Sequence, residues 1–160
     1  MFGILKNKKV ILKAPLSGEL VRIDDVPDEA FALKMIGDGI AIKPDTPFLL
    51  SPVNGEVIQK FSTNHALGIR TKEGLEILLH MGIDTVDLKG LGFEPLISEG
   101  ERVSVGQRLL KIDWDIIADK APSIISPIVI TNMEIVEKME ILKEEYVKIN
   151  QDLLAITIKK

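Results

Sequence analysis

The sequence lacks cysteine altogether and is poor in aromatic residues, which make up 4% of its 160 residues. The absence of cysteine excludes disulfide bonds, thiolate nucleophiles and thiolate metal sites. With so few aromatic rings the core must be mostly aliphatic, and its isoleucines and valines favour β-strands. The chain has two histidines, His65 and His80, and few other reactive side chains.

An excess of positive charge is also missing, since the formal net charge is −4. This argues against a nucleic-acid-binding protein, which needs a basic face to meet phosphates. Residues 1–6 have no long apolar stretch ahead of the lysines, so they predict neither a signal peptide nor a membrane span. The sequence therefore predicts a cytoplasmic protein, long enough for one domain with a hydrophobic core.

Short apolar runs separated by glycine and proline occur along the whole chain. Runs of this length and spacing are typical of an all-β protein, either an antiparallel β-sandwich or a barrel. They cover residues 10–12, 18–23, 39–42, 55–61, 66–70, 75–81, 102–112, 124–130 and 153–158.

Two stretches favour short helices. Residues 27–35 open with Pro-Asp-Glu, which suits a first helical turn, and residues 114–121 follow Asp113, a suitable N-cap. Residues 133–148 are ambiguous, because glutamate, lysine and methionine favour a helix whereas the segment that follows is strand-like. We expect strands there, with a turn near residues 150–151.

Part of the sequence is repeated. APLSGELVRI at residues 14–23 and SPVNGEVIQK at residues 51–60 share a small residue, proline, an apolar residue, a small residue, Gly-Glu and two apolar residues. The match predicts a duplicated β-motif with a tight turn at each glycine. SPIVITN at residues 126–132 is a weaker third copy, which ordinary reuse of turn residues explains.

The two histidines lie on the two arms of a predicted β-hairpin with its turn at residues 71–74. A loop of even length would place His65 directly opposite His80, with Cβ atoms about 5 Å apart. A three-residue loop pairs the apolar residues near the tip better, but it puts the histidines on opposite faces of the sheet. An extra residue, a β-bulge at Gly68, would reconcile the two patterns.

An imidazole pair is suited to phosphoryl transfer. The pKa of histidine is about 6.5, so a neutral nucleophilic nitrogen exists near neutral pH. The reaction needs an in-line nucleophile and donors around three charged oxygens. We assign His80 as the nucleophile, His65 as a donor and Thr63 as the hydroxyl that orients His65. Asp84 is available for a cation brought by a partner.

Three other interpretations stay open on chemistry alone. Each histidine can be an ordinary packed or solvent-facing side chain. Two histidines with a carboxylate can bind zinc, as in a zinc-dependent hydrolase on a related β-scaffold, although no tightly spaced ligand motif such as H-x-H is present. A protein that regulates partners without chemistry would carry no acid-labile, base-stable phosphate with any donor.

Five segments of the chain resemble one known family: APLSGELVRIDDVPDEAF, IGDGIAIKP, FSTNHALGI, LLHMGIDTVDLKG and EGERVSVGQ. They are similar to the glucose-specific enzyme IIA of the bacterial sugar phosphotransferase system. The H-x-G-x-D-T-V motif, with T-N-H upstream of it, is a highly specific signal. The resemblance implies one enzyme IIA domain at residues 10–160 after a short tail at residues 1–9. The initial methionine suggests the free-standing form.

The resemblance also implies a mechanism. Phospho-HPr, the histidine phosphocarrier, would phosphorylate Nε2 of His80, which would pass the group to a cysteine of the permease IIB domain. His65 would stabilise the phosphoryl group, with Thr63 behind it. No cofactor would be required, although zinc at the histidine pair belongs to the hydrolase alternative. The permease would choose the sugar, and association at the membrane would be transient.

Because donor and acceptor are both proteins, the resemblance implies an exposed apolar patch for docking. The expected residues are Phe31, Met35, Ile36, Phe61 and Leu78, with Asp28 and Asp84 as an acidic rim for a basic partner. Taken singly, the apolar residues are better explained as core, the first aspartate as the start of a helix and the second as part of a turn.

Overall fold

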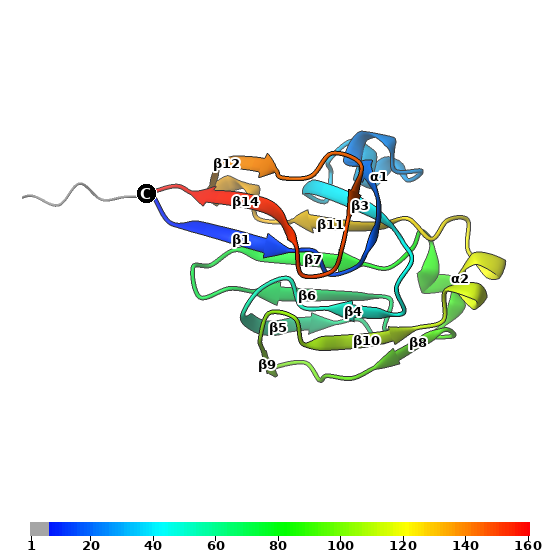
Figure 1. The fold of residues 1–160 in the computed structure, drawn as a ribbon. Helices are drawn as coiled ribbons and strands as arrows, with labels where there is room; N and C mark the ends of the chain where they lie inside the picture. Colours follow the sequence, from blue (N-terminus) through cyan, green and yellow to red (C-terminus); the bar gives the residue numbers. More distant parts are fainter. Residues whose placement is uncertain (1–6) are drawn as a thin grey trace, which may run out of the picture.

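The computed structural model describes residues 7–160, which form an antiparallel β-sandwich with two short α-helices (Figure 1). The all-β prediction is thus confirmed. The first six residues of the expected tail at residues 1–9 lie outside the described residues. The strands are β1 (Lys9–Lys13), β2 (Gly18–Arg22), β3 (Asp38–Pro44), β4 (Phe48–Leu50), β5 (Gly55–Lys60), β6 (Ala66–Arg70), β7 (Glu76–His80), β8 (Phe93–Pro95), β9 (Arg102–Val103), β10 (Arg108–Ile112), β11 (Ser126–Ile130), β12 (Val136–Ile141), β13 (Tyr146–Val147) and β14 (Asp152–Ile158).

Both predicted helices are present, and each is shorter than expected. They are α1 (Glu29–Ala32) and α2 (Trp114–Lys120). Asp28 and Asp113 cap them, since each carboxylate accepts hydrogen bonds from the backbone N–H groups two and three residues further on. Short 3-10 helices add Ile23–Asp25, Thr85–Leu88 and Met133–Ile135.

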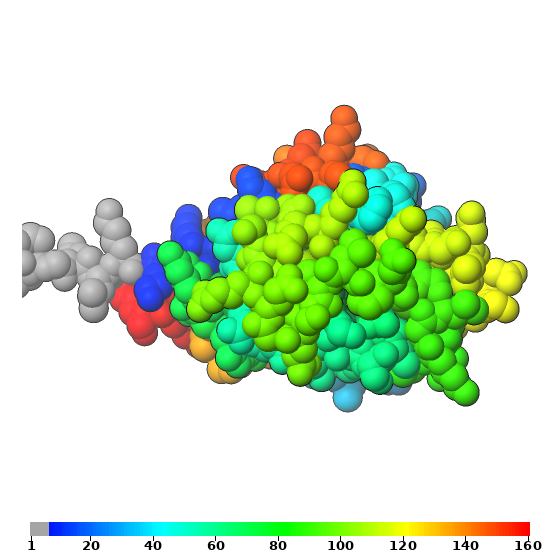
Figure 2. Space-filling view, turned by 90° about the horizontal axis from the view of Figure 1, so that it is seen from below, coloured from blue at the N-terminus to red at the C-terminus, as the bar shows by residue number. Residues whose placement is uncertain are grey.

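Three sheets build the sandwich. The largest has the strand order β13-β2-β3-β11-β7-β6-β5-β9, and the smaller ones have the orders β1-β14-β12 and β4-β10-β8. The main core lies between the large sheet and the two small ones, because it draws buried aliphatic side chains from all three. The chain around β8 and β10 forms much of the surface seen in Figure 2.

The opposite face of the large sheet carries a second, smaller apolar cluster. Along β7 burial alternates, so that Ile77 and Leu79 enter the main core while Leu78 packs against the second cluster. By the same alternation His80 lies on the face of Leu78. Phe31 of α1 belongs to this cluster, which therefore holds α1 beside the end of β7.

The repeated motif forms the same local structure twice. β2 and β5 begin at equivalent glycines, Gly18 and Gly55. A Cβ atom would lie 2.0 Å from the Lys43 carbonyl oxygen at the first glycine and 2.5 Å from the Arg70 carbonyl oxygen at the second. Any side chain would therefore collide with the neighbouring strand, which explains why both copies keep glycine. The predicted duplication is confirmed.

The β6–β7 hairpin has the register of the three-residue loop along its whole length. Ala66, not His65, pairs with His80, and no irregularity interrupts the pairing of the two strands. The predicted bulge at Gly68 and the direct pairing of the histidines are therefore wrong. The irregularity lies instead on β5, where that strand pairs with β6. In the ambiguous segment, strands β12 and β13 are present as expected, and a turn at residues 149–150 follows them, close to its predicted position.

Candidate functional site

The structure brings the two imidazole rings together by a different backbone route from the one predicted. His80 ends β7 and is partly exposed, whereas His65 precedes β6 and is 4% exposed. The ring centroids are 5.1 Å apart and the ring planes are inclined by 80°. The His65 carbonyl accepts a hydrogen bond from the N–H of Met81 at 2.8 Å, so the two histidines are diagonal neighbours at the open end of the hairpin.

A tight turn before β6 sets the direction of His65. Asn64 has a φ of 58°, in the left-handed region that asparagine tolerates. Its N–H donates to the carbonyl of Phe61 at 2.8 Å, and its Oδ1 accepts from Nζ of Lys60 at 2.8 Å. Because His65 lies outside the regular strand, strand alternation does not decide which face its side chain takes. No bulge is needed to bring it to His80.

The imidazoles occupy the middle of a row of four rings. The ring centroid of Phe31 lies 5.1 Å from that of His80, and the centroid of Phe61 lies 5.2 Å from that of His65. Both contacts are edge-on, with inclinations of 63° and 61°. The two phenyl rings therefore form apolar walls, which reduce the hydration of the imidazoles between them.

A backbone hydrogen bond fixes the tautomer of His80. Its Nδ1 lies 2.8 Å from the carbonyl oxygen of Gly82. Because a carbonyl oxygen only accepts, Nδ1 carries the proton, and the lone pair of the neutral ring is on Nε2. Nδ1 of His65 is held by a side chain instead, since Oγ1 of Thr63 lies 2.5 Å from it, and a hydroxyl can either donate to this nitrogen or accept from it.

Both rings are neutral near pH 7. Burial, and then the neighbouring His80, lowers the pKa of His65 to about 4. Burial also lowers the pKa of His80, although the Gly82 carbonyl and the carboxylates of Asp28 and Asp84 oppose that shift. A neutral imidazole with an unprotonated nitrogen is a competent nucleophile, so His80 has the protonation state that group transfer requires.

The predicted apolar patch is exposed to different degrees. Met35 is 73% exposed, whereas Phe31 is only 3% exposed and forms a wall of the site beside His80. Phe31 is thus not the exposed side chain that we expected. Three members are partly exposed, namely Ile36, Phe61 and Leu78.

The two predicted rim carboxylates differ in what else they do. Asp28 accepts from the N–H groups of Ala30 and Phe31 at 2.9 and 3.3 Å, so it caps α1 as well as facing the histidine. Asp84 is exposed and has a φ of 56° in the turn after β7. Both act on His80 through their charge, which raises its pKa.

Sequence reasoning missed three residues that shape the loop after His80. They are Gly82, Thr85 and Ser126. The Gly82 carbonyl accepts from His80, Oγ1 of Thr85 donates to the Met81 carbonyl, and Oγ of Ser126 accepts from the Gly82 N–H. Gly82 and Thr85 belong to the H-x-G-x-D-T motif, which was the available signal. Ser126 comes from β11, and only the folded structure brings it to the loop.

The hydrolase alternative gains no support from the described residues. Within residues 7–160, no group of three or more His, Cys, Asp or Glu side chains is arranged to hold a metal ion. The zinc site would need at least one further ligand beside the two imidazoles.

Across residues 7–160, no helix is both long enough and apolar enough to cross a membrane.

Fold and site together define a class: a β-sandwich that presents a neutral histidine pair at the open end of a hairpin. Residues 10–136 match the family described as the phosphoenolpyruvate-dependent sugar phosphotransferase system, EIIA 1. The chain belongs to this family and is an enzyme IIA component, a phosphoryl carrier in sugar uptake. The resemblance that the sequence motifs indicated is thereby confirmed.

Individual relatives agree with this assignment. The chain is 45% identical over 141 residues to the PTS system glucose-specific EIIA component of Bacillus cereus, covering 88% of this chain and 86% of the relative. It is 48% identical over 123 residues to the N-acetylglucosamine-specific EIICBA component of Escherichia coli K12, covering 77% of this chain and 19% of that protein. The solved structure of glucose permease IIA from Mycoplasma capricolum matches with a TM-score of 0.89 at 41% identity, over 97% of this chain and 99% of the other.

Proposed function

We propose that His80 accepts a phosphoryl group on Nε2 from phospho-HPr and passes it to a cysteine of a sugar permease IIB domain. The observation that carries this proposal is the hydrogen bond between Nδ1 of His80 and the Gly82 carbonyl. It places the ring proton on Nδ1 and leaves Nε2 as the nitrogen with a lone pair. Partial exposure of the ring allows a partner to reach it.

In the first step, the Nε2 lone pair forms a bond to phosphorus as the bond between phosphorus and the donor nitrogen breaks. The His80 ring gains positive charge while Nδ1 keeps its proton. The groups that raise the pKa of His80, namely the Gly82 carbonyl, Asp28 and Asp84, stabilise this charge for the same electrostatic reason. In the second step a cysteine thiolate attacks phosphorus, and the electron pair of the broken bond returns to Nε2.

His65 is proposed to stabilise the phosphoryl oxygens. If the hydroxyl of Thr63 donates to Nδ1 of His65, the ring proton is on Nε2 and can be donated to an oxygen. The pKa of about 4 keeps His65 neutral near pH 7. A neutral donor stabilises the transferring group less strongly than a cation would. This suits a carrier that must release the group as readily as it accepts it.

The partner surface is proposed to surround the histidine row. Met35, Ile36, Phe61 and Leu78 are at least partly exposed, and Asp84 supplies negative charge for a basic partner. The Escherichia coli relative, named an EIICBA component, contains further components in one chain, which supports a sugar permease as partner of this chain. We place the reaction in the cytoplasm, with transient association at the membrane, no cofactor and no nucleic acid.

The permease is proposed to choose the sugar. The relatives with 45% and 48% identity are named for glucose and for N-acetylglucosamine. Similarity in this domain therefore does not separate the two sugars, which fits a component that never contacts sugar. We assign residues 10–160 to one enzyme IIA domain, to which Lys9 also belongs because β1 begins there.

The test is incubation with enzyme I, HPr and phosphoenolpyruvate, followed by measurement of the intact mass. We expect one added phosphoryl group, labile in acid and stable in base, on the unaltered protein and none on His80→Gln. Asn132→Ala is the control and should be labelled fully, because the Asn132 side chain bonds to Gly74 and Glu76 at the other end of the hairpin. Complete labelling of His80→Gln would refute the assignment.

A further inference from the structure

The peptide group between Met81 and Gly82 is held on both of its edges by side chains. Oγ1 of Thr85 donates to the Met81 carbonyl at 2.6 Å, and the Gly82 N–H donates to Oγ of Ser126 at 3.0 Å. Both side chains belong to residues with 0% exposure, so water does not compete for these bonds. Rotation of this peptide group would break both of them.

The next peptide group, between Gly82 and Ile83, is held in the same manner. The Gly82 carbonyl accepts from Nδ1 of His80 at 2.8 Å, and the Ile83 N–H donates to the carbonyl of Ser123 at 3.0 Å. Two consecutive peptide groups are thus fixed, and the carbonyl that determines the tautomer of His80 belongs to the second of them. Its direction depends on contacts from the segment that leads into β11.

Ser126 is committed to this contact by its second hydrogen bond. Its Oγ donates to the carbonyl of Ile124 at 2.9 Å, so the hydroxyl proton points away and a lone pair faces the Gly82 N–H. Gly82 has a φ of 72°, and a Cβ atom there would lie 2.7 Å from Cγ2 of Thr85. The turn is therefore tight, and both hydroxyls are bonded to its backbone.

We propose that Ser126 and Thr85 are positioning residues for His80: by fixing the Met81–Gly82 peptide, they restrict the conformation of Gly82, so that the Gly82 carbonyl in the following peptide points at Nδ1 and the proton stays off Nε2. The inference rests on the proposed role of His80 as the phosphoryl acceptor. Loss of either hydroxyl removes one of the two bonds that hold the Met81–Gly82 peptide, so Gly82 gains conformational freedom and its carbonyl leaves Nδ1 for part of the time. The neutral ring then populates the tautomer that carries the proton on Nε2, which cannot attack phosphorus.

The test combines ring-nitrogen NMR with phosphorylation rates. The chain has two histidines, so 15N-labelled histidine gives four ring resonances, recorded where both rings are neutral. In the unaltered protein, Nδ1 of His80 should be protonated and Nε2 should not. In Ser126→Ala and in Thr85→Val, we expect a population protonated on Nε2 and a rate of phosphorylation about tenfold lower, the smaller of the effects known for residues that orient a metal-bound histidine.

Ser51→Ala is the matched control. Ser51 is 1% exposed, and its hydroxyl donates to the carbonyl of Val53 at 2.6 Å in the connection between β4 and β5, outside the row of rings. This variant should lose a buried hydroxyl without changing the His80 tautomer or the rate. A tautomer shift in Ser51→Ala equal to that in Ser126→Ala would overturn the proposal, since it would reflect general loosening.

An unchanged His80 tautomer in both test variants would overturn the proposal, whatever happens to the rate. If Ser126→Ala does not fold, Thr85→Val, which keeps the shape of the side chain, decides by itself. Failure of the unaltered protein to accept phosphate on His80 would contradict the proposed function. It would leave the ring resonances as an independent test of the positioning.

Discussion

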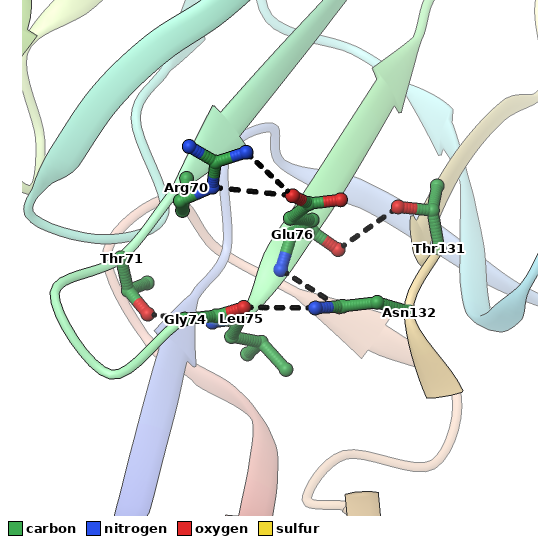
Figure 3. Close-up of polar contacts among 7 residues, drawn as sticks. All are labelled: Arg70, Thr71, Gly74, Leu75, Glu76, Thr131 and Asn132. Carbon is green, nitrogen blue, oxygen red and sulfur yellow. Dashed lines mark hydrogen bonds and ion pairs between the residues drawn. The ribbon is translucent and has the colours of Figure 1, made fainter. Parts of the chain in front are cut away.

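The two ends of the β6–β7 hairpin use polar side chains in opposite ways. At the closed end, Nε and Nη2 of Arg70 donate to Oε1 of Glu76 at 3.1 and 2.8 Å. Asn132 accepts from the Glu76 N–H at 2.9 Å and donates to the Gly74 carbonyl at 2.8 Å (Figure 3). At the open end, each histidine is held through Nδ1 alone, and among residues 7–160 no hydrogen bond to Nε2 of either ring is found.

This contrast separates polar contacts that build the fold from those that prepare a reaction. The closed end brings donors and acceptors together so that each satisfies another. The open end fixes the orientation of two rings through Nδ1, and in the proposed function Nε2 of each ring meets the phosphoryl group. Changes at the open end should therefore alter transfer, and changes at the closed end should alter stability only.

The largest effect is expected at the open end, from His65→Gln. The variant should still accept a phosphoryl group, because His80 is unchanged. Onward transfer to the IIB cysteine should fall about 100- to 1,000-fold, the usual effect of losing one donor to a developing charge. The measurement is the rate at which purified phosphoprotein labels isolated IIB. Onward transfer at the unaltered rate would remove His65 from the mechanism.

The second-largest effect is expected from acid, which should destabilise the folded protein by protonating His65 at the open end. The pKa of His65 is about 4 in the folded protein and 6.5 in its unperturbed state, so between these values the unfolded chain binds more protons. The contribution of the buried, neutral His65 ring to the free energy of unfolding is complete above pH 6.5 and is lost as pH falls toward 4. The loss is up to about 3 kcal/mol, and the lowered pKa of His80 adds in the same direction.

Denaturant unfolding at a series of pH values measures this loss. Carboxylates also titrate at the lower pH values, so the informative quantity is the difference between the unaltered protein and His65→Gln. That difference in the free energy of unfolding should shrink as the pH falls from 6.5 toward 4. Parallel stability curves for the two proteins would show that His65 is not held neutral by burial.

A smaller effect on stability is expected at the closed end, from Asn132→Ala. The change leaves the Glu76 N–H and the Gly74 carbonyl without their side-chain partner. We expect a loss of about 1–2 kcal/mol in the free energy of unfolding, since partly buried groups lose their hydrogen bonds. Phosphorylation of His80 should be unaffected. A transfer defect with unchanged stability would contradict the separation of the two ends.

The smallest effect is expected from Arg70→Ala, also at the closed end. The Arg70 and Glu76 side chains are 52% and 31% exposed, so water and salt screen their ion pair. The variant should lose less than about 1 kcal/mol in the free energy of unfolding. The loss should diminish further in concentrated salt. A larger loss that persists in salt would mean that Arg70 stabilises the hairpin through packing.

Much of the fold could be predicted because its determinants are local. Short apolar runs between glycines and prolines indicated the strands, and Asp28 and Asp113 marked the helix starts. The repeated glycines at residues 18 and 55 indicated the duplication. Each strand run, each helix start and each copy of the repeat is made of residues close together in the sequence. These signals can therefore be read without knowledge of the fold.

The details of the site could not be predicted in the same way. The position of His65 depends on the φ of 58° at Asn64, which a pairing argument based on regular strands does not include. The burial of Phe31 depends on a second apolar cluster built from several strands. Ser126 is brought to Gly82 only by the folding of β11 against the hairpin, and the residues next to Ser126 in the sequence do not indicate that contact.

The central claim is that Nε2 of His80 carries the phosphoryl group, and ring-nitrogen NMR of the phosphorylated protein tests it most directly. With histidine labelled by 15N, coupling to phosphorus identifies the bonded nitrogen among the four that the chain contains. We expect coupling to Nε2 of His80 alone. Coupling to Nδ1 of His80, or to either nitrogen of His65, would contradict it.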